Sequence, residues 1–422
     1  MRNKLNIIFV LGLFAFLVFR LLLVPVAHHG DLNNNISWGN EAISRGLVNY
    51  YEGKDWPYSA PNQPPLYILL FTFMSFLYKN ITDISWNLNS KFSFFPSGFI
   101  WFWQRWGMEY LVKLPSIISD LGIALVVFKF FKRRDKEKMG FVVSLLWLVN
   151  PIIWYNSSVW GQTDAIVNLL GLLSVVYLLN KNIVKSFLFF TLSLLFKGSL
   201  LTFAPIILAV ALYQKHRFKE WIASVLVSAL FVVTICIWFH PQINLPIWLF
   251  DLYTKRFFPG EIGSLTANAF NFWWLVDSGK TLDSTVFFGL TARIWGLLIL
   301  AVSELAMVKF LSKKITDKKI LMSLSFVSLV SFLFMTRIHE RYLYPFFPYA
   351  TLLVGFDFMW IIPVIILSMS NLINLYNLFW APSIPVLEHS LINLPVGNYL
   401  AVVNLVIFAF VVFLLVHPDQ KG

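Results

Sequence analysis

Long apolar runs recur along the whole chain, and they restrict it to one kind of environment. The runs lie at 5–26, 108–130, 139–155, 163–180, 220–239, 288–311, 320–336, 342–357, 359–378 and 399–416. A helix needs about 20 predominantly apolar residues to cross the hydrocarbon core of a bilayer. We therefore predict an all-α polytopic membrane protein, a single domain over 1–422 with about 10–12 transmembrane helices.

The composition agrees with lipid as the solvent. Of the 422 residues, 58% are hydrophobic and 13% are charged, whereas soluble domains are about 45–50% apolar and about 25% charged. The net charge of +12 does not indicate nucleic-acid binding, because the basic residues form short clusters between apolar runs. No nucleic-acid partner is expected. The single Cys236 excludes an internal disulfide framework.

Basic clusters give the orientation, because Lys and Arg are retained on the cytoplasmic side of membrane proteins. The N-terminus, with Arg2, and the cluster 132–138 should then both be cytoplasmic. An even number of crossings must separate them, and 5–26 with 108–130 supply two. The short apolar run 66–78 is left as an interfacial or re-entrant helix within a large first external loop, 28–107.

The same counting applies further along the chain. Basic residues flank 186–213 on both sides, so this stretch should enter and leave on one side as two short helices, with Lys197 near the tip. The segment 240–287 becomes a second large external loop. The cluster 313–319 and the C-terminus fall in the cytoplasm.

Polar motifs that are distant in sequence share the external face in this threading. They lie at 28–31, 150–164, 256–261 and 337–342. Ionisable side chains near the membrane are costly and often functional. Their convergence on one face indicates a functional site.

Asp31 stands directly after the first predicted span. A carboxylate at a membrane surface can be tuned to accept a proton, although a lone loop acid is also explained by simple solvation. His28 and His29 beside Asp31 could bind a metal, but adjacent His side chains diverge and no third ligand is evident. We expect no cofactor, and a divalent metal is left open.

Other charged residues are candidates for binding an anion. Arg337, His339, Glu340 and Arg341 lie between two spans, where Arg could bind phosphate oxygens in a bidentate manner or the group could simply pair with itself. Lys197 needs an anionic partner or a route to water. Asp120, near the middle of a span, also needs a partner, and we expect its role to be structural.

Asp164 follows Gly161-Gln162-Thr163 at a predicted helix start. Thr163 can cap that helix, and an acid in the first turn interacts favourably with the helix dipole. This structural role alone accounts for the residue.

Six short motifs occur in order between about residues 30 and 345. They are Gly30-Asp31, Gln63-Pro64-Pro65-Leu66-Tyr67, Trp160-Gly161-Gln162-Thr163-Asp164, Phe196-Lys197 with Pro205, Arg256-Phe257-Phe258-Pro259 with Asn271-Phe272-Trp273, and His339-Glu340-Arg341-Tyr342. Through them the chain resembles the membrane glycosyltransferases of the GT-C type that use polyprenyl-phosphate sugars. It is most similar to the prokaryotic proteins compared to GPI mannosyltransferases, and also to the dolichyl-phosphate-glucose-dependent glucosyltransferases.

The resemblance implies inverting transfer of a hexose, with mannose favoured, from a polyprenyl-phosphate donor. The acceptor would be a hydroxyl of a lipid-linked, glycan or protein molecule on the non-cytoplasmic face. Asp31 would be the catalytic base, and the residues implied in binding substrate or phosphate are Asp164, Gln162, Lys197, Arg256, His339, Glu340 and Arg341. In a prokaryote the membrane would be the plasma membrane.

This chain departs from the family at one point. Some relatives have a paired Asp-Glu in the first external loop, whereas Asp31 is followed by Leu32 and Glu41 is only a distant second candidate. A metal-bridged mechanism is therefore in doubt. The alternative function is a transporter or flippase, because such proteins use helices broken as at Lys197-Gly198. The lack of an internal repeat and the one-sided motifs argue against it.

Overall fold

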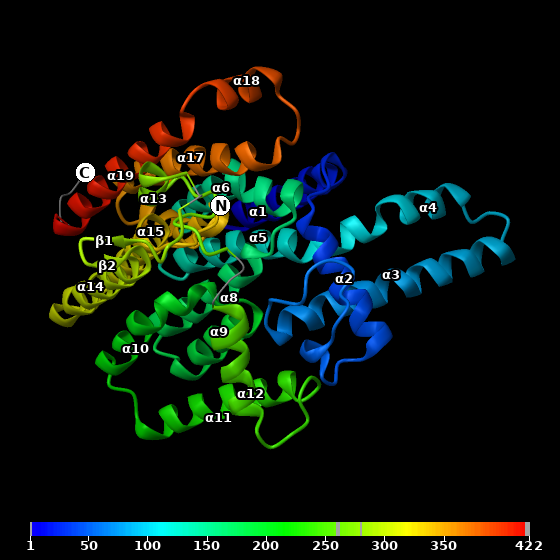
Figure 1. Cartoon of the computed structure of the whole chain (residues 1–422), viewed down its shortest axis with the longest axis horizontal. Helices are drawn as coiled ribbons and strands as arrows, with labels where there is room; N and C mark the ends of the chain where they lie inside the picture. The colour runs from blue at the N-terminus through cyan, green and yellow to red at the C-terminus, as the bar shows by residue number, and fades with distance from the viewer. Residues whose placement is uncertain (1, 259–261, 279–280, 418–422) are drawn as a thin grey trace.

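The structure is a computed structural model that describes residues 2–258, 262–278 and 281–417. Most of its helices form one bundle (Figure 1). They are α1 (Arg2–Leu23), α5 (Met108–Lys132), α6 (Glu137–Val149), α8 (Asp164–Leu179), α9 (Ile183–Phe196), α10 (Ala204–Tyr213), α11 (Phe218–Cys236), α14 (Ala292–Lys313), α15 (Asp317–Phe334), α16 (Phe346–Val354), α17 (Ile361–Phe379) and α19 (Val396–Val416).

Further helices connect or flank this bundle. They are α2 (Asp31–Arg45), α3 (Pro65–Lys91), α4 (Ser97–Phe102), α7 (Pro151–Trp154), α12 (Leu245–Leu252), α13 (Phe272–Val276) and α18 (Pro385–Asn393). Short 3₁₀ or π segments are η1 (Val24–Val26), η2 (Tyr50–Glu52), η3 (Trp103–Gly107), η4 (Tyr155–Trp160), η5 (Gly198–Phe203), η6 (Tyr253–Phe257), η7 (Glu340–Leu343) and η8 (Phe358–Trp360). The strands β1 (Val286–Phe287) and β2 (Leu290–Thr291) form an antiparallel hairpin.

The predicted all-α polytopic class is confirmed. Among the described residues, six helices are long and apolar enough to cross a membrane, or seven if the pair Glu137–Val149 and Pro151–Trp160, bent by 52°, is one span. The other predicted spans correspond to shorter helices, α8 and α16, or to α15, whose first turn carries three charges. The predicted total of about 10–12 transmembrane helices therefore requires that these shorter helices also cross the membrane, packed against their neighbours.

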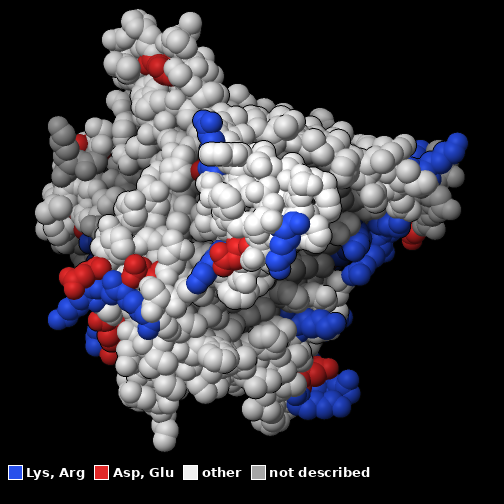
Figure 2. Space-filling model, turned by 90° about the vertical axis from the view of Figure 1, so that its right-hand side faces the viewer, with Lys and Arg blue, Asp and Glu red and all other residues white. Residues whose placement is uncertain are grey.

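Apolar side chains cover much of the outer surface. On α1 the side chain of Phe14 is 64% exposed, and on α11 that of Leu226 is 63% exposed. Figure 2 shows broad areas without charged side chains, with Lys, Arg, Asp and Glu gathered in a few places. Such a surface is stable in lipid, and the charged groups mark where the chain reaches water.

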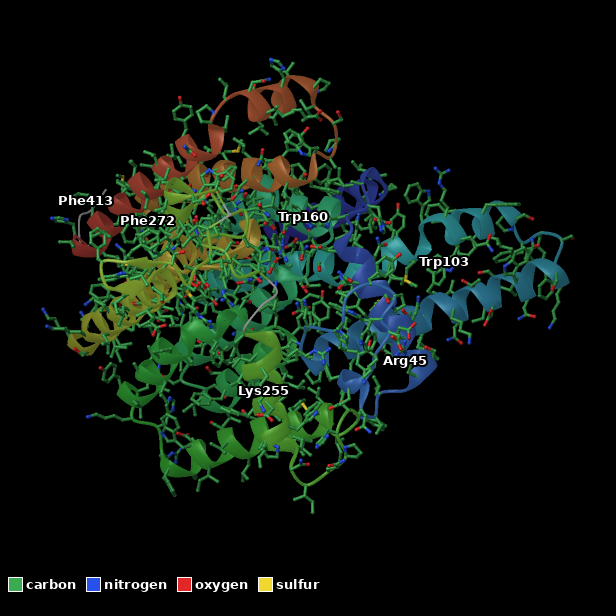
Figure 3. The ribbon with its side chains drawn as sticks, in the orientation of Figure 1. Arg45, Trp103, Trp160, Lys255, Phe272 and Phe413 are labelled. Carbon is green, nitrogen blue, oxygen red and sulfur yellow. The ribbon has the colours of Figure 1, made fainter. Side chains whose placement is uncertain are left out.

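The first predicted external loop contains a projecting arm. The apolar run 66–78 is only the first half of α3, because the helix continues through polar residues to Lys91. It runs beside α4 and η3, which continue into α5 as one helix over Ser97–Lys132 (Figure 1). Trp103 lies on this arm, far from Trp160 in the body (Figure 3), and donates a hydrogen bond to Thr82 Oγ1 at 3.1 Å. Whether the arm lies at the membrane interface stays a prediction.

The predicted pair of short helices at 186–213 is confirmed as α9 and α10. Lys197 lies at the break, with extended backbone, and η5 follows it. Gly198 follows the break directly, Pro205 lies in the first turn of α10, and neither residue favours a continuous helix.

A buried ion pair joins distant helices in the body. Arg20 of α1 donates to Asp120 of α5 at 2.6 Å, and both side chains are fully buried. Tyr344, after η7, donates to the other carboxylate oxygen. Asp120 thus has the partner it was expected to need, and its role here is structural.

Candidate active site

Most of the predicted site residues lie at interruptions between helices. Asp31 begins α2, Asp164 begins α8, and Lys197 lies between α9 and η5. His339 precedes η7, which contains Glu340 and Arg341. Helix ends leave backbone groups without helical partners, so polar side chains collect there at less cost than within a span.

The carboxylate of Asp31 is held by a residue from the segment before α8. Gln162 Nε2 donates to Asp31 Oδ2 at 2.6 Å, and the Asp31 side chain keeps 43% of its surface exposed. The backbone N–H of Asp31 donates to His29 Nδ1 at 3.1 Å. The carboxylate is therefore fixed in orientation but open to a ligand.

Charge keeps Asp31 ionised. Burial acts to raise the pKa of its carboxyl, but the positive charge of Arg341, with His29 and the Gln162 hydrogen bond, outweighs burial and lowers the pKa below its usual value of 3.8. At neutral pH Asp31 is thus an anion that can accept a proton.

The two His residues before Asp31 face different partners. The ring of His29 packs against that of Trp160 at an interplanar angle of 33°, with ring centroids 4.4 Å apart, and burial lowers the pKa of its imidazole. His28 Nδ1 lies 2.7 Å from Glu109 Oε2, and this hydrogen bond raises the pKa of His28. Among the described residues, no group of three or more His, Cys, Asp or Glu is arranged to hold a metal ion.

A buried lysine joins the two segments that carry Asp31 and Gln162. Lys113 of α5 donates from Nζ to Ala27 O at 2.7 Å and to Val159 O at 3.1 Å. Gly161 has a left-handed φ of 88°, and a Cβ there would lie 2.8 Å from Leu32 of α2. Because Gly161 has no side chain and Lys113 binds both segments, the two segments lie close enough for Gln162 to contact Asp31.

A second acid, Asp164, follows Gln162 by two residues and is already paired. Asp164 is buried and accepts a hydrogen bond from Lys197 Nζ at 2.7 Å. The same ammonium lies 5.2 Å from the ring centroid of Tyr342. Lys197, at the break between α9 and η5, has found the anionic partner that a lysine in this position needs.

The segment 339–342 supplies one neutral and one charged donor. Burial, together with the charges of Arg341 and Lys197, lowers the pKa of His339 to about 3, so its imidazole is neutral at neutral pH. Arg341 Nη1 donates to the fully buried Glu340 at 2.7 Å, and Asn371 of α17 holds the Glu340 carbonyl. His339 can therefore donate a hydrogen bond, while Arg341 supplies positive charge.

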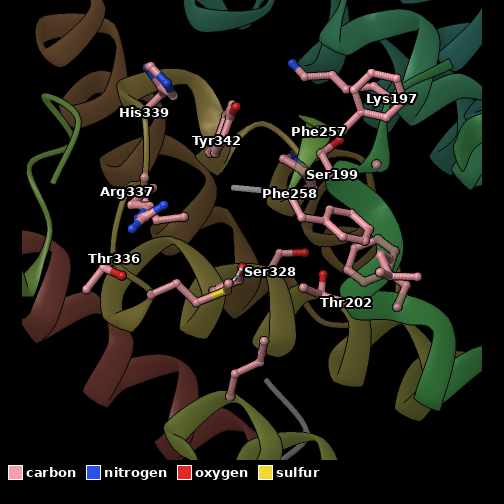
Figure 4. Close-up of a pocket in the computed structure, with 18 of the residues that line it drawn as sticks. Lys197, Ser199, Thr202, Phe257, Phe258, Ser328, Thr336, Arg337, His339 and Tyr342 are labelled. Carbon is pink, nitrogen blue, oxygen red and sulfur yellow. Dashed lines mark hydrogen bonds between the residues drawn. The ribbon is translucent and has the colours of Figure 1, made fainter. Parts of the chain in front are cut away.

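A cavity of about 670 Å³ opens beside this cluster. Figure 4 shows Lys197 and His339 on opposite sides of its upper part, with Ser328 and Thr202 deeper. Its lining includes Asp164, Lys197, Tyr342 and His339 at one end and Leu201, Phe203, Leu297, Leu300, Glu304 and Ser328 towards α14 and α15. The volume is typical of a small-molecule or cofactor site, and polar side chains occur at both ends of the lining.

Comparison with known proteins gives a similarity over part of the chain. No protein-family model matches the chain. Over 133 residues it is 29% identical to the GPI mannosyltransferase 1 of Candida albicans, and this segment is 31% of the length of each protein. The similarity supports a membrane protein of the glycosyltransferase type.

The structure brings together most of the predicted site but not all of it. Asp164, Lys197 and His339 line the cavity, whereas Asp31, Gln162, Glu340 and Arg341 lie behind or beside it, in contact with one another or coupled by charge. Arg256 lies apart, where its guanidinium donates to the Tyr51 carbonyl. The next residues, Phe257 and Phe258, line the cavity, and Pro259, Gly260 and Glu261 lie outside the described residues.

Some residues of the site were not predicted from the sequence. Glu41, the second candidate acid, pairs with Arg45 one turn further along α2 and lies ten residues from Asp31, or about 15 Å along a helix. Lys113 and Glu109 were missed, and Tyr342 was noted only as part of a motif, without a role. Lys113 could have been found, because a lysine in an apolar run is as unusual as the Asp120 that was noticed.

Proposed function

We propose that the protein is an inverting hexosyltransferase, with mannose favoured, that uses a polyprenyl-phosphate donor. It transfers the sugar to a hydroxyl of a lipid-linked, glycan or protein acceptor on the non-cytoplasmic face. The proposal rests chiefly on one observation: the carboxylate of Asp31 is coupled by charge to Arg341 and His339, beside a cavity that Lys197 and His339 line and that extends along α14. The similarity to a GPI mannosyltransferase supports it.

The shape of the cavity fits a lipid carrier. Arg293 and Glu304 of α14 both line it, and eleven residues of helix correspond to about 16 Å along its axis. Apolar side chains such as Leu297 and Leu300 line the intervening length. A free sugar would gain no binding energy from this apolar part of the cavity, whereas a prenyl chain would bury apolar surface in it.

In this proposal Asp31 accepts the proton of the acceptor hydroxyl. The hydroxyl oxygen forms a bond to the anomeric carbon of the hexose, and the bond from that carbon to the phosphate oxygen breaks. Polyprenyl phosphate leaves with the electron pair. Asp164 is paired with Lys197 and Glu340 with Arg341. These described carboxylates near the site are therefore not free to act as a nucleophile, which favours single-step inversion over a double displacement.

The departing phosphate gains negative charge, which the cluster can stabilise. Lys197 and Arg341 are cations, and His339, neutral at neutral pH, would donate a hydrogen bond. Fixed donors of this kind stabilise charge without reorganisation during the reaction.

The test uses purified protein in lipid nanodiscs with radiolabelled donors. We expect label to pass from polyprenyl-phosphate mannose to a membrane acceptor extract, with less from polyprenyl-phosphate glucose and none from GDP-mannose. Lys197→Met should reduce transfer, and Lys255→Met, which removes a lysine exposed on η6, should not. Transfer from GDP-mannose alone would contradict the proposal.

A transporter or flippase is the second candidate, and the break at Lys197 between α9 and η5 favours it. Sealed vesicles containing the protein decide between the two. Movement of a lipid-linked sugar across the bilayer without a new glycosidic bond would support the transporter and contradict transfer.

A further inference from the structure

A second hollow lies at the opposite end of α5 from the candidate active site. It has a volume of about 600 Å³ between α1 and α5. Lys113, at the site end of α5, is sixteen residues from Lys129, which lines the hollow, and this corresponds to about 24 Å of helix. The hollow therefore faces the other leaflet of the membrane and has no part in the proposed transfer reaction.

Its walls divide into an apolar part and a basic rim. Phe9 and Phe128 stack with ring centroids 4.1 Å apart and form the floor with Val10. Lys129 and Arg133 line the rim. Since they are four residues apart on a helix, they project on the same side.

These two cations have no acidic partner among the described residues, unlike their neighbours. In the part of the chain that the structure describes, Arg134 pairs with Asp317, and Lys132 pairs with Glu137 at 3.2 Å. Neither Lys129 nor Arg133 makes an ion pair with any described residue, and both are exposed. The chain has no Asp or Glu before Asp31, so α1 cannot supply an acid.

Lys132 instead fixes the shape of the hollow. Its Nζ donates to Asn6 Oδ1 at 2.6 Å and so ties the end of α5 to the start of α1. Basic residues that only orient a membrane protein need no such cavity. Basic pockets between transmembrane helices are typical binding sites for anionic lipid headgroups.

We propose that this hollow binds an anionic phospholipid of that leaflet. The phosphodiester headgroup pairs with Lys129 and Arg133, and the first part of an acyl chain lies along Phe9 and Val10. The anionic headgroup matches the two unpaired cations, and the acyl chain matches the apolar floor, so one lipid satisfies both halves of the site.

The experiment is native mass spectrometry of the purified protein released from nanodiscs that contain equal phosphatidylglycerol and phosphatidylcholine. We expect wild-type protein to retain phosphatidylglycerol preferentially. Lys129→Gln/Arg133→Gln should retain roughly tenfold less of it. The matched control, Lys313→Gln/Lys314→Gln, removes the same charge from exposed residues at the end of α14 and should retain it like wild type.

A second variant tests the floor without changing charge. Val10 is 62% exposed, so Val10→Trp should fill the hollow without disturbing the core and should also reduce retention. Equal retention by the Lys129→Gln/Arg133→Gln variant and its control would overturn the proposal. A dimer that Val10→Trp dissociates would overturn it too, because a second copy would then occupy the hollow.

Discussion

Arg341 has two electrostatic effects within one short segment. It pairs with the buried carboxylate of Glu340, and its charge lowers the pKa of Asp31. The second effect links a residue that is far away in sequence to the proposed base, and it can be measured directly.

The pH dependence of transfer should report this coupling. Because Arg341 lowers the pKa of Asp31, the carboxylate remains ionised to low pH and activity is lost only as pH falls through that lowered value. We expect Arg341→Gln to raise the pKa and move the acidic limb of kcat/KM up by about one pH unit or more. Arg341→Lys keeps the charge and should move it less. An unchanged acidic limb in Arg341→Gln would remove Asp31, or its coupling to Arg341, from the mechanism.

Some residues of the site could be predicted from their residue type and their position in the sequence alone. Asp31, Asp164 and Lys197 stood out because each is an ionisable group beside a predicted span, and the structure places them at helix ends. The contact of Gln162 with Asp31 could not be predicted, because it depends on Gly161 packing against α2 and on Lys113 binding two carbonyls. Such contacts are set by tertiary packing, which a single sequence does not encode locally.

At the scale of elements, the buried pair of Arg20 and Asp120 connects α1 with α5. Removing one partner from a buried pair leaves an uncompensated charge and costs about 3–5 kcal/mol. We therefore expect Arg20→Met to lower the thermal unfolding midpoint in detergent markedly. Arg20→Met/Asp120→Asn should recover much of the loss, since Asn is neutral and can still accept from Tyr344. A double variant no more stable than Arg20→Met would contradict this account.

Element boundaries were predicted well where apolar runs begin or end at charges or at Pro and Gly. This holds for α11, for α19 and for the break at Lys197 between α9 and η5. It failed for α3, which continues well past Tyr78, because antiparallel packing on η3 stabilises a helix that its own apolarity does not require. Hydropathy along the sequence identifies helices that face lipid. It misses helices that are stabilised by packing on neighbouring helices.

At the scale of the whole molecule, the cavity connects the polar cluster to the membrane. If the prenyl chain lies along α14, narrowing the cavity should raise KM for long-chain donors more than for a donor with two isoprene units. Leu297 lines the cavity and is 48% exposed, so Leu297→Trp should act in this way. Leu298→Trp is the matched control, because Leu298 is 44% exposed on the same helix and is not part of the lining. If Leu297→Trp raised KM equally for long and short donors, the prenyl chain would not lie along α14.

The central claim is that Asp31 is the base of a transfer reaction from a polyprenyl-phosphate hexose. The most direct measurement compares initial rates of radiolabelled hexose transfer by purified wild type, Asp31→Asn and Asp83→Asn, an exposed acid on α3. We predict a loss of about a hundredfold or more for Asp31→Asn, with an unchanged unfolding midpoint, and wild-type rates for Asp83→Asn. Near wild-type turnover by folded Asp31→Asn would contradict the account.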